Sequence, residues 1–293
     1  MVSIENLQKH IEFLAKNSRV PGTEYHKECQ YYIRTLLENY GYEVEDFVFP
    51  YYDFYGHKKY GNNIIGKIEC GKDIILLGAH YDTAIGTPGA DDNASGVSAL
   101  LEIARCIKES KEKLNCSIWI VAFDLEEYGF IGSHYLVEHI KCQNIKVKQS
   151  IVLESIGYTS NKKVYEILPG KIKIKMLLKR PLIAVRYLTM KSDFVVIAGD
   201  NSSRNFVNIL KRNMDNLGLK NLVYITKNRG IELPQVRLSD HRNFWDNDIP
   251  SIMITDTAFM RNPNYHKETD TIETLDFDFL EKIANSILYA ILA

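Results

Sequence analysis

The sequence lacks several features that would each indicate a particular class of protein. Its five cysteines include no CxxC pair, which excludes the thiolate zinc sites and redox pairs that depend on that spacing. We expect the cysteines to be reduced and buried within apolar patterns, as Cys106 is in ALLEIARCI. Lysine and arginine total 36, and aspartate and glutamate total 37. This near-zero net charge predicts no nucleic acid and no anionic membrane as a partner.

Long apolar stretches are also absent. Runs such as IWIVAF are far shorter than the roughly 20 residues needed to span a bilayer. The opening segment MVSIENLQKHIEFLAKNSRV carries charges throughout and has no continuous apolar region of the signal-peptide kind. We therefore expect a soluble protein of the cytoplasm.

The sequence does contain a repeated alternation of strand and helix patterns. Its 293 residues, 45% of them apolar, are enough to bury a sizeable core. Strand patterns occupy 42–55, 62–69, 73–80, 116–123, 147–154, 193–200, 222–226 and 250–257, and 171–178 also alternates as a strand does. Helical patterns occupy 4–14, 23–40, 95–110, 131–139, 201–218 and 276–292. This order predicts an α/β fold, with helices flanking a mostly parallel mixed central sheet in three layers.

Three predicted strands are followed at once by side chains that bind metals or move protons. In open α/β sheets, sites form outside the carboxyl ends of the strands. We therefore expect these side chains to meet at one edge of the sheet: His80 with Asp82, Glu126 with Glu127, and Glu154.

Two of these motifs have a specific physical interpretation. In HYD, Asp82 lies two residues after His80 and on the same face of a strand, so it can accept a hydrogen bond from the second ring nitrogen and fix the tautomer. In GADDNASG, an aspartate at the start of a helix could bridge two cations or only cap the helix. Spacing alone does not choose between Asp91 and Asp92.

Two later motifs add further histidines. Asp240 and His241 in LSDH could form a metal pair, an orienting pair or a plain loop, and His266 lies in a polar loop with no core role. Imidazoles and carboxylates without thiolates suit Zn²⁺, with Mn²⁺ or Co²⁺ as alternatives. A two-ion site needs one shared carboxylate and two further ligands per ion. The residues supply these ligands and leave one glutamate to act as a base.

Six motifs in this order resemble the co-catalytic two-zinc aminopeptidases, the family of bacterial leucyl aminopeptidases and aminopeptidase Y. They are GAHYDT, GADDNASG, DLEEYGFIGS, LESIGY, LSDH and YHKETDT, within about residues 76–275. The resemblance implies a zinc-peptidase-like fold and a single metallopeptidase domain over 1–293, with 157–235 contributing to the substrate pocket. It also implies hydrolysis of the N-terminal residue from peptides with a free amino terminus.

The resemblance assigns five ligands to two divalent ions, most simply zinc: His80 and Glu154 for the first, Glu127 and His266 for the second, and Asp92 as the bridge. Well-known members carry Asp where this chain has Glu154, and LESIGY resembles a variant subgroup.

The resemblance also assigns the other site residues. Glu126 would be the general base, and Asp82 would orient His80. Asp240 and His241 would line the site without binding metal, and Tyr265 would stabilise the oxyanion.

Three alternatives remain open. A glutaminyl-peptide cyclotransferase has a similar fold and ligand set but holds one zinc, whereas the intact DDNASG favours two metals. The related metallo-carboxypeptidases and deacylases usually carry an inserted dimerisation domain, and no composition break marks one here. A non-catalytic binding domain would have lost ligands or the base. Separately, we expect the aromatic cluster of Tyr51, Tyr52, Phe54 and Tyr55 to pack in the core or to contact another copy.

Overall fold

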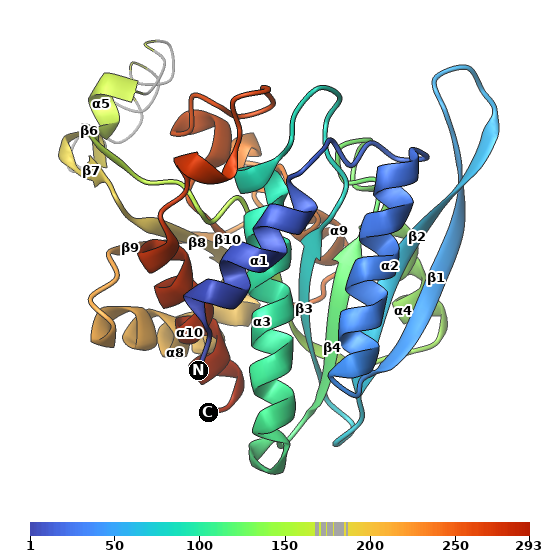
Figure 1. The fold of residues 1–293 in the computed structure, drawn as a ribbon. Coiled ribbons are helices and arrows are strands. Elements are labelled where there is room, and N and C mark those ends of the chain that lie inside the picture. Colours follow the sequence, from blue (N-terminus) through green and yellow to red (C-terminus); the bar gives the residue numbers. More distant parts are fainter. Residues whose placement is uncertain (168–169, 171–173, 175–177, 179–184, 186) are drawn as a thin grey trace.

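The computed structural model describes residues 1–167, 170, 174, 178, 185 and 187–293. Its centre is an eight-stranded mixed sheet in the order β1-β2-β4-β3-β5-β10-β8-β9 (Figure 1). These strands are β1 (Glu43–Tyr52), β2 (Lys58–Ile68), β3 (Ile74–His80), β4 (Ser117–Phe123), β5 (Val147–Glu154), β8 (Val195–Asp200), β9 (Asn221–Thr226) and β10 (Ser251–Thr255). The strand predicted at 171–178 falls largely outside the described residues.

The middle of the sheet is parallel and its flanks are mixed. β3 runs parallel to both β4 and β5, and β10 runs parallel to β5. The pairs β1–β2, β2–β4 and β10–β8 are antiparallel, whereas β8 and β9 are parallel. The predicted α/β class with a mostly parallel mixed sheet is therefore confirmed.

One neighbour relation differs from the chain order. β2 and β3 follow each other in the sequence, yet β4 lies between them in the sheet. All seven residues of β3 are buried, which suits a central strand that packs helices on both faces. β2 instead pairs antiparallel with β4 and with the edge strand β1.

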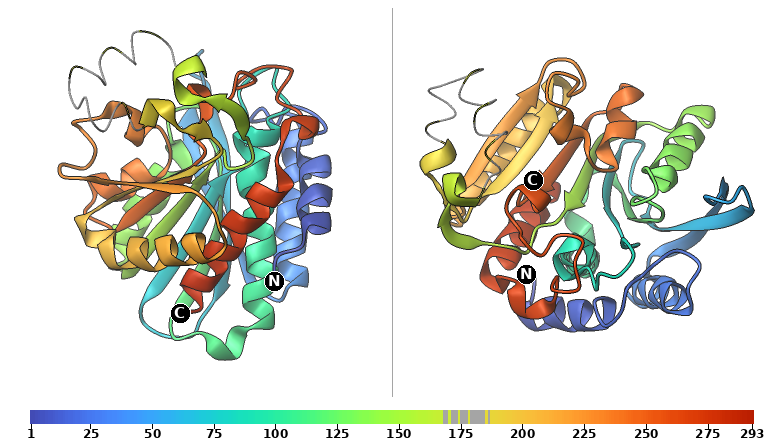
Figure 2. Two further views of the ribbon diagram at one scale, coloured as in Figure 1. Left: turned by 90° about the vertical axis from the view of Figure 1, so that its left-hand side faces the viewer. Right: turned by 90° about the horizontal axis from the view of Figure 1, so that it is seen from above.

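Helices cover both faces of the sheet (Figures 1 and 2). One face carries α1 (Ile4–Leu14), α2 (Glu24–Asn39), α3 (Gly96–Glu109), α8 (Arg204–Asn216) and α10 (Phe277–Ile291), whose apolar sides share one large core with the strands. The other face carries α4 (Ile131–Cys142) and α9 (His241–Asp246) over a second core that includes Trp119 and Phe244. A small sheet of β6 (Ser160–Lys163) and β7 (Lys191–Ser192) leads into and out of α5 (Val164–Ile167).

Local sequence signals explain where several helices begin. The side chains of Ser3, Thr23 and Asp276 each accept a backbone N–H at the first turn of α1, α2 and α10, which satisfies a donor that the helix itself leaves free. Inside the sheet, Gly78 is required because a Cβ there would lie 2.3 Å from the Phe123 ring.

Two further expectations can be compared with the structure. All five cysteines are free, and Cys29, Cys106 and Cys116 are buried as expected. Cys70 and Cys142 are exposed instead, so the expectation that all five are buried was wrong. Within the described part of the chain, no helix has the length and apolar character needed to cross a membrane.

Candidate metal centre

The candidate site lies where the three parallel central strands end together. His80 pairs in register with Phe123 at the end of β4, and Ala79 pairs with Leu153 of β5. The strand ends are therefore level, and the residues that follow them share one edge of the sheet. The start of α3 and the loop 256–271 approach the same edge from elsewhere in the chain.

One group of potential metal ligands, the first donor group, contains His80, Glu126 and Glu154, whose ligand atoms lie within 4.8 Å of one another. All three side chains are buried. His80 Nε2 lies 3.5 Å from Glu154 Oε2 and 4.0 Å from Glu126 Oε2. The Ser239 hydroxyl donates to Glu154 Oε2 at 2.7 Å. Glu154, the predicted ligand at which well-known family members carry Asp, is therefore held in place by a second residue.

A second group of potential metal ligands, the second donor group, contains Asp92, Glu127 and His266, whose ligand atoms also lie within 4.8 Å of one another. His266 Nε2 lies 3.0 Å from Glu127 Oε1 and 3.1 Å from Asp92 Oδ2. The other oxygen of that aspartate, Oδ1, lies 3.3 Å from His80 Nε2. Asp92 therefore stands between the two groups with one oxygen toward each.

Asp82 contacts both His80 and the glutamate pair. His80 Nδ1 lies 3.2 Å from the Asp82 backbone carbonyl and 3.5 Å from Asp82 Oδ1. The same carboxylate accepts the backbone N–H of Glu126 at 3.0 Å and that of Glu127 at 3.2 Å. These two contacts, which spacing along the chain could not reveal, tie the turn after β4 to the end of β3.

Asp91 points away from the histidines. Its Oδ1 accepts the Gly157 N–H at 2.9 Å, and its Oδ2 accepts from the Asn262 amide at 2.8 Å. The two possibilities that spacing left open therefore differ in contacts, because only Asp92 faces His80 and His266.

Asp270 is a residue that the sequence reasoning passed over. Its two carboxylate oxygens accept the backbone N–H groups of Asp91 and Asp92, both at 3.1 Å. The Asp270 carbonyl also accepts the Ala90 N–H at 3.1 Å. Asp270 lies in YHKETDT four residues after His266, so this motif provides both a donor and the support for Asp92. The two backbone N–H groups that it accepts are 179 and 178 positions away in the chain, so its spacing gave no signal of this role.

Arg19 is a second residue that motif reading missed. It is fully buried, and its guanidinium donates to the backbone carbonyls of Leu14, Tyr81, Pro88 and Gly89. These contacts join the end of α1 to the two loops that carry His80 and Asp92. A single arginine between two helical patterns gave no sign of this position.

Three other predicted site residues have different surroundings. Asp240 is fully buried. Two members of the first donor group act on its pKa, which the charge of His80 lowers and that of Glu154 raises. His241 contacts the Val236 carbonyl at 2.6 Å and packs edge-on against Trp245. Tyr265 stacks on His266, with ring centroids 3.9 Å apart.

The electrostatics show an excess of carboxylates. Burial is the main cause that raises the pKa of Glu126 well above its usual value, and burial raises the pKa of Glu127 and of Asp240 to about 7. Burial disfavours protonated His266, yet Asp92 and Glu127 raise its pKa to about 10. Adjacent buried carboxylates cannot all ionise without positive charge close by, so this cluster requires either protons or cations.

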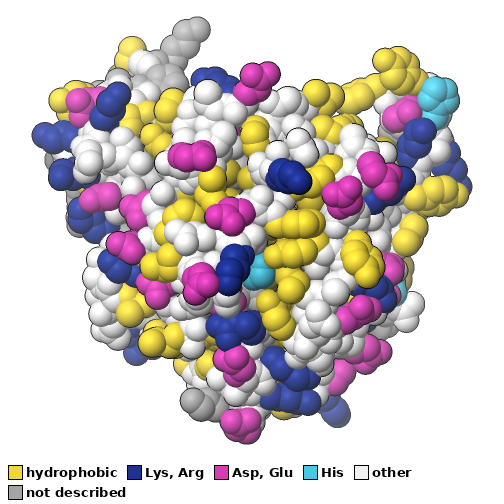
Figure 3. Space-filling model, in the orientation of Figure 1, with side chains coloured by type: hydrophobic (Ala, Val, Ile, Leu, Met, Phe, Trp, Pro, Cys, Tyr) yellow, Lys and Arg dark blue, Asp and Glu magenta, His cyan; other side chains and the backbone are white. Residues whose placement is uncertain are grey.

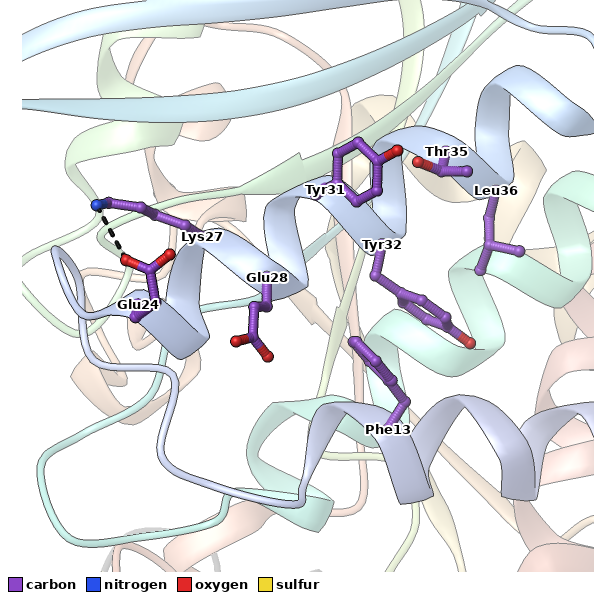
Figure 4. A pocket seen from close by; sticks show the side chains of 8 residues that line it. All are labelled: Phe13, Glu24, Lys27, Glu28, Tyr31, Tyr32, Thr35 and Leu36. Atoms are coloured by element: carbon purple, nitrogen blue, oxygen red, sulfur yellow. Dashed lines mark hydrogen bonds and ion pairs between the residues drawn. The ribbon is translucent and has the colours of Figure 1, made fainter.

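A groove elsewhere in the molecule contains none of these residues. It has a volume of about 540 Å³ and lies between α1 and α2, next to the stacked rings of Phe13 and Tyr32 (Figure 4). Glu24 and Lys27 pair at one end. None of the residues that line it belongs to either donor group.

Comparison with known proteins agrees with this location. The model of peptidase family M28 matches residues 63–291, a range that contains every donor described above. This chain belongs to peptidase family M28. Among curated members, the uncharacterized protein YfbL of Escherichia coli is 34% identical over 73% of this chain and 65% of its own length. The chain therefore spans less than two thirds of that relative.

Solved structures share the fold of this member of family M28. An aminopeptidase from an Aneurinibacillus strain matches with a TM-score of 0.74 and 15% identity over 99% of this chain and 93% of its own. The glutaminyl cyclase of Porphyromonas gingivalis matches with the same TM-score of 0.74 and 20% identity, over 99% and 97%. One neighbour is an aminopeptidase and the other a glutaminyl cyclase, so fold similarity alone does not choose between these two activities.

Proposed function

We propose that this M28 peptidase is a metal-dependent aminopeptidase that releases the N-terminal residue of peptides with a free amino terminus. The observation that carries the proposal is the position of Asp92, with one carboxylate oxygen 3.3 Å from His80 and the other 3.1 Å from His266. A two-ion site requires a shared carboxylate in this arrangement.

The remaining donors fit two divalent ions. Together with Asp92, His80 and Glu154 would hold one ion, and Glu127 and His266 would hold the other. His80 Nε2 is buried and has no hydrogen-bond partner among the described residues, although carboxylates surround it. A cation would satisfy that nitrogen. Imidazole and carboxylate donors suit Zn²⁺, with Co²⁺ or Mn²⁺ as alternatives.

This division of donors leaves Glu126 without a necessary ligand role. It lies within the first group, and its raised pKa reflects a position in which it can hold a proton. Ions bound at the two positions would supply Lewis-acid polarisation of the scissile carbonyl and would acidify a water molecule. Glu126 would take the proton of that water and pass it to the departing amine nitrogen.

Other residues would prepare these groups. Asp82 would hold both the His80 ring and the backbone of the Glu126–Glu127 turn. Tyr265, stacked on His266, would donate a hydrogen bond from its hydroxyl to the oxyanion. Buried Asp240 would line the site beside the first donor group without binding metal. His241 would support the wall through Trp245.

The first experiment measures hydrolysis of aminoacyl-p-nitroanilides. We expect activity that a chelator abolishes and that added Zn²⁺, Co²⁺ or Mn²⁺ restores. Glu126→Gln should lower kcat by about 100-fold or more, the scale of a lost general base, and should still bind two ions. Glu5→Gln, which changes an exposed glutamate of α1, is the matched control. Turnover close to wild type in Glu126→Gln would refute the assigned base.

A glutaminyl cyclase is the second candidate, because a cyclase structure matches this fold as well as an aminopeptidase structure does. It requires one zinc. One bound ion per chain, together with cyclisation of N-terminal glutamine peptides and no release of amino acid, would favour the cyclase and reject the aminopeptidase.

A further inference from the structure

The ribbon formed by β1 and β2 continues past the edge of the sheet that holds the donors. Ile64 of β2 is the partner of Ala122, next to the end of β4, so lower-numbered residues of β2 extend beyond that end. From Asn63 to His57 the ribbon rises ~20 Å at roughly 3.3 Å per residue. Figures 1 and 3 show it standing clear of the body, with hydrophobic side chains along it.

The tip of this ribbon presents aromatic rings to solvent. Phe54 is 91% exposed and Tyr55 86% exposed, which contradicts the first of our two expectations for this cluster, packing in the core; contact with another copy stays a prediction. The turn is nevertheless held in a defined conformation, because Asp53 Oδ1 accepts the backbone N–H groups of Tyr55 and His57, both at 2.9 Å. A turn fixed in this way loses little conformational freedom when its rings bind a ligand.

A cavity lies beside these rings. It has a volume of about 370 Å³ and is lined by Tyr51, Phe54, Tyr55 and Tyr128, among others. Tyr128 directly follows the donor Glu127 in the chain, and its ring lies 6.0 Å from that of Phe54. The opposite wall contains Pro21–Thr23, which follow the buried Arg19. One lining residue of the cavity, Tyr128, is therefore the direct chain neighbour of Glu127 in the second donor group.

The charges in the cavity favour an anionic end of a ligand. Lys59 lines it and forms no ion pair within the described part of the chain. Asp53 also lines it, but its carboxylate is already engaged by two backbone N–H groups and lies 3.3 Å from His57 Nδ1. A free ammonium beside aromatic rings suits the C-terminal carboxylate of a short apolar peptide.

We propose that this cavity, the ribbon cavity, binds the residues of a peptide substrate that follow the scissile bond, with a preference for apolar and aromatic side chains in short peptides. The inference rests on the proposed aminopeptidase function and specifies its substrate class. A peptide whose N-terminal residue occupies the donor groups must extend away from them, and Tyr128 places one wall of the ribbon cavity next to Glu127 in the chain.

The test compares substrates that can and cannot reach the ribbon cavity. Leucinamide has no residue beyond the scissile bond, whereas Leu-Gly-Phe-Phe and Leu-Gly-Ser-Ser differ only in the side chains offered to the rings. We expect kcat/KM for the phenylalanine peptide to exceed that for the serine peptide by roughly tenfold, the effect of about 1.4 kcal/mol of aromatic contact.

The double variant Phe54→Ser/Tyr55→Ser should lose this preference and hydrolyse leucinamide as the wild type does. Tyr52→Ser is the matched control, because Tyr52 is 69% exposed on the same ribbon but does not line the cavity. Lys59→Met should remove any advantage of the free-acid peptide over its C-terminal amide. If the double variant kept the preference for the phenylalanine peptide over the serine peptide, the proposal would be overturned. This holds even if sedimentation showed that the exposed rings join two copies of the chain.

A binding measurement separates this inference from the proposed function. The probe is Leu-Gly-Phe-Phe with its first peptide bond reduced to CH₂–NH, which cannot be hydrolysed. If wild type leaves leucinamide intact but binds this probe about tenfold more tightly than the double variant does, the aminopeptidase proposal fails and the ribbon cavity stands. If wild type and the double variant bind the probe equally, the ribbon cavity proposal fails whatever the activity.

Discussion

Replacing Asp270 by asparagine tests whether this residue holds the shared carboxylate in position. Each carboxylate oxygen of Asp270 accepts one backbone N–H, from Asp91 and from Asp92, at 3.1 Å. An asparagine keeps one acceptor and presents an NH₂ donor toward the other N–H. The variant therefore loses one hydrogen bond to a charged group and leaves a buried donor unpaired.

The size of the effect follows from that loss. A hydrogen bond to a charged group contributes about 1.5–3 kcal/mol, which corresponds to roughly a 10- to 150-fold change in an equilibrium constant. Because Asp92 faces both donor groups, we expect much of this loss to appear as weaker metal binding. Losses of about 10- to 100-fold are usual when a residue supporting a ligand is replaced.

The assay is competition for Zn²⁺ against a chromophoric chelator, together with denaturant unfolding of the metal-free protein. Asp278→Asn, an exposed change in the first turn of α10, is the control and should leave metal affinity unchanged. If Asp270→Asn folded normally and bound Zn²⁺ within twofold of wild type, Asp270 would not be what holds Asp92 in position.

Three further predictions concern pH, the buried arginine and one glycine. His266 has a folded pKa raised to about 10 from an unfolded value near 6.5, so between these values the metal-free folded state holds a proton that the unfolded state has lost. The free energy of unfolding of the metal-free protein should therefore fall from pH 7 to pH 9. Urea titrations should find a smaller fall in His266→Gln. The fall should also be smaller in the zinc-loaded protein, because zinc binds neutral imidazole. The lysine in Arg19→Lys has too few N–H donors for the four backbone carbonyls that Arg19 contacts. The variant should lose about 1–3 kcal/mol of stability for each carbonyl left unpaired, whereas the exposed control Arg212→Lys should not. Equal urea midpoints for Arg19→Lys and the wild type would contradict this. Gly132→Ala would place a Cβ 2.3 Å from the Asp124 carbonyl oxygen and should destabilise by about 1–3 kcal/mol, whereas Gly71→Ala, with its nearest atom at 3.4 Å, should be tolerated in the same titration.

The edge of the sheet that carries the donors was predictable for a simple reason. His80, Glu126 and Glu154 each end or directly follow an apolar strand pattern, and β3, β4 and β5 are parallel neighbours. Strand order was less accessible. Nothing in the apolar patterns of residues 62–69 and 73–80 indicates that β4 inserts between them, because that choice depends on pairing between segments far apart in the chain. That residues 1–293 form a single domain stays a prediction.

Details within the site depended on contacts over long sequence distances. Asp91 and Asp92 are equivalent in spacing, and the difference arises because Gly157 and Asn262, which are 66 and 171 positions away, both donate to the Asp91 carboxylate. Similarly, alternation in residues 42–55 predicts a strand but cannot show that it extends past its neighbours. Core packing was therefore one of the two alternatives expected for the aromatic rings near its end, whereas Tyr52, Phe54 and Tyr55 are exposed.

The position of Asp92 between two histidines also links the two metal positions to each other. An ion held on one side would fix the carboxylate for the other side, so the two ions would bind as a dependent pair. Thermodynamic reciprocity then requires that the second ion raise the affinity for the first by the same factor by which the first raises the affinity for the second. Partial removal of metal would yield a mixture of fully loaded and empty chains, with few chains that carry a single ion.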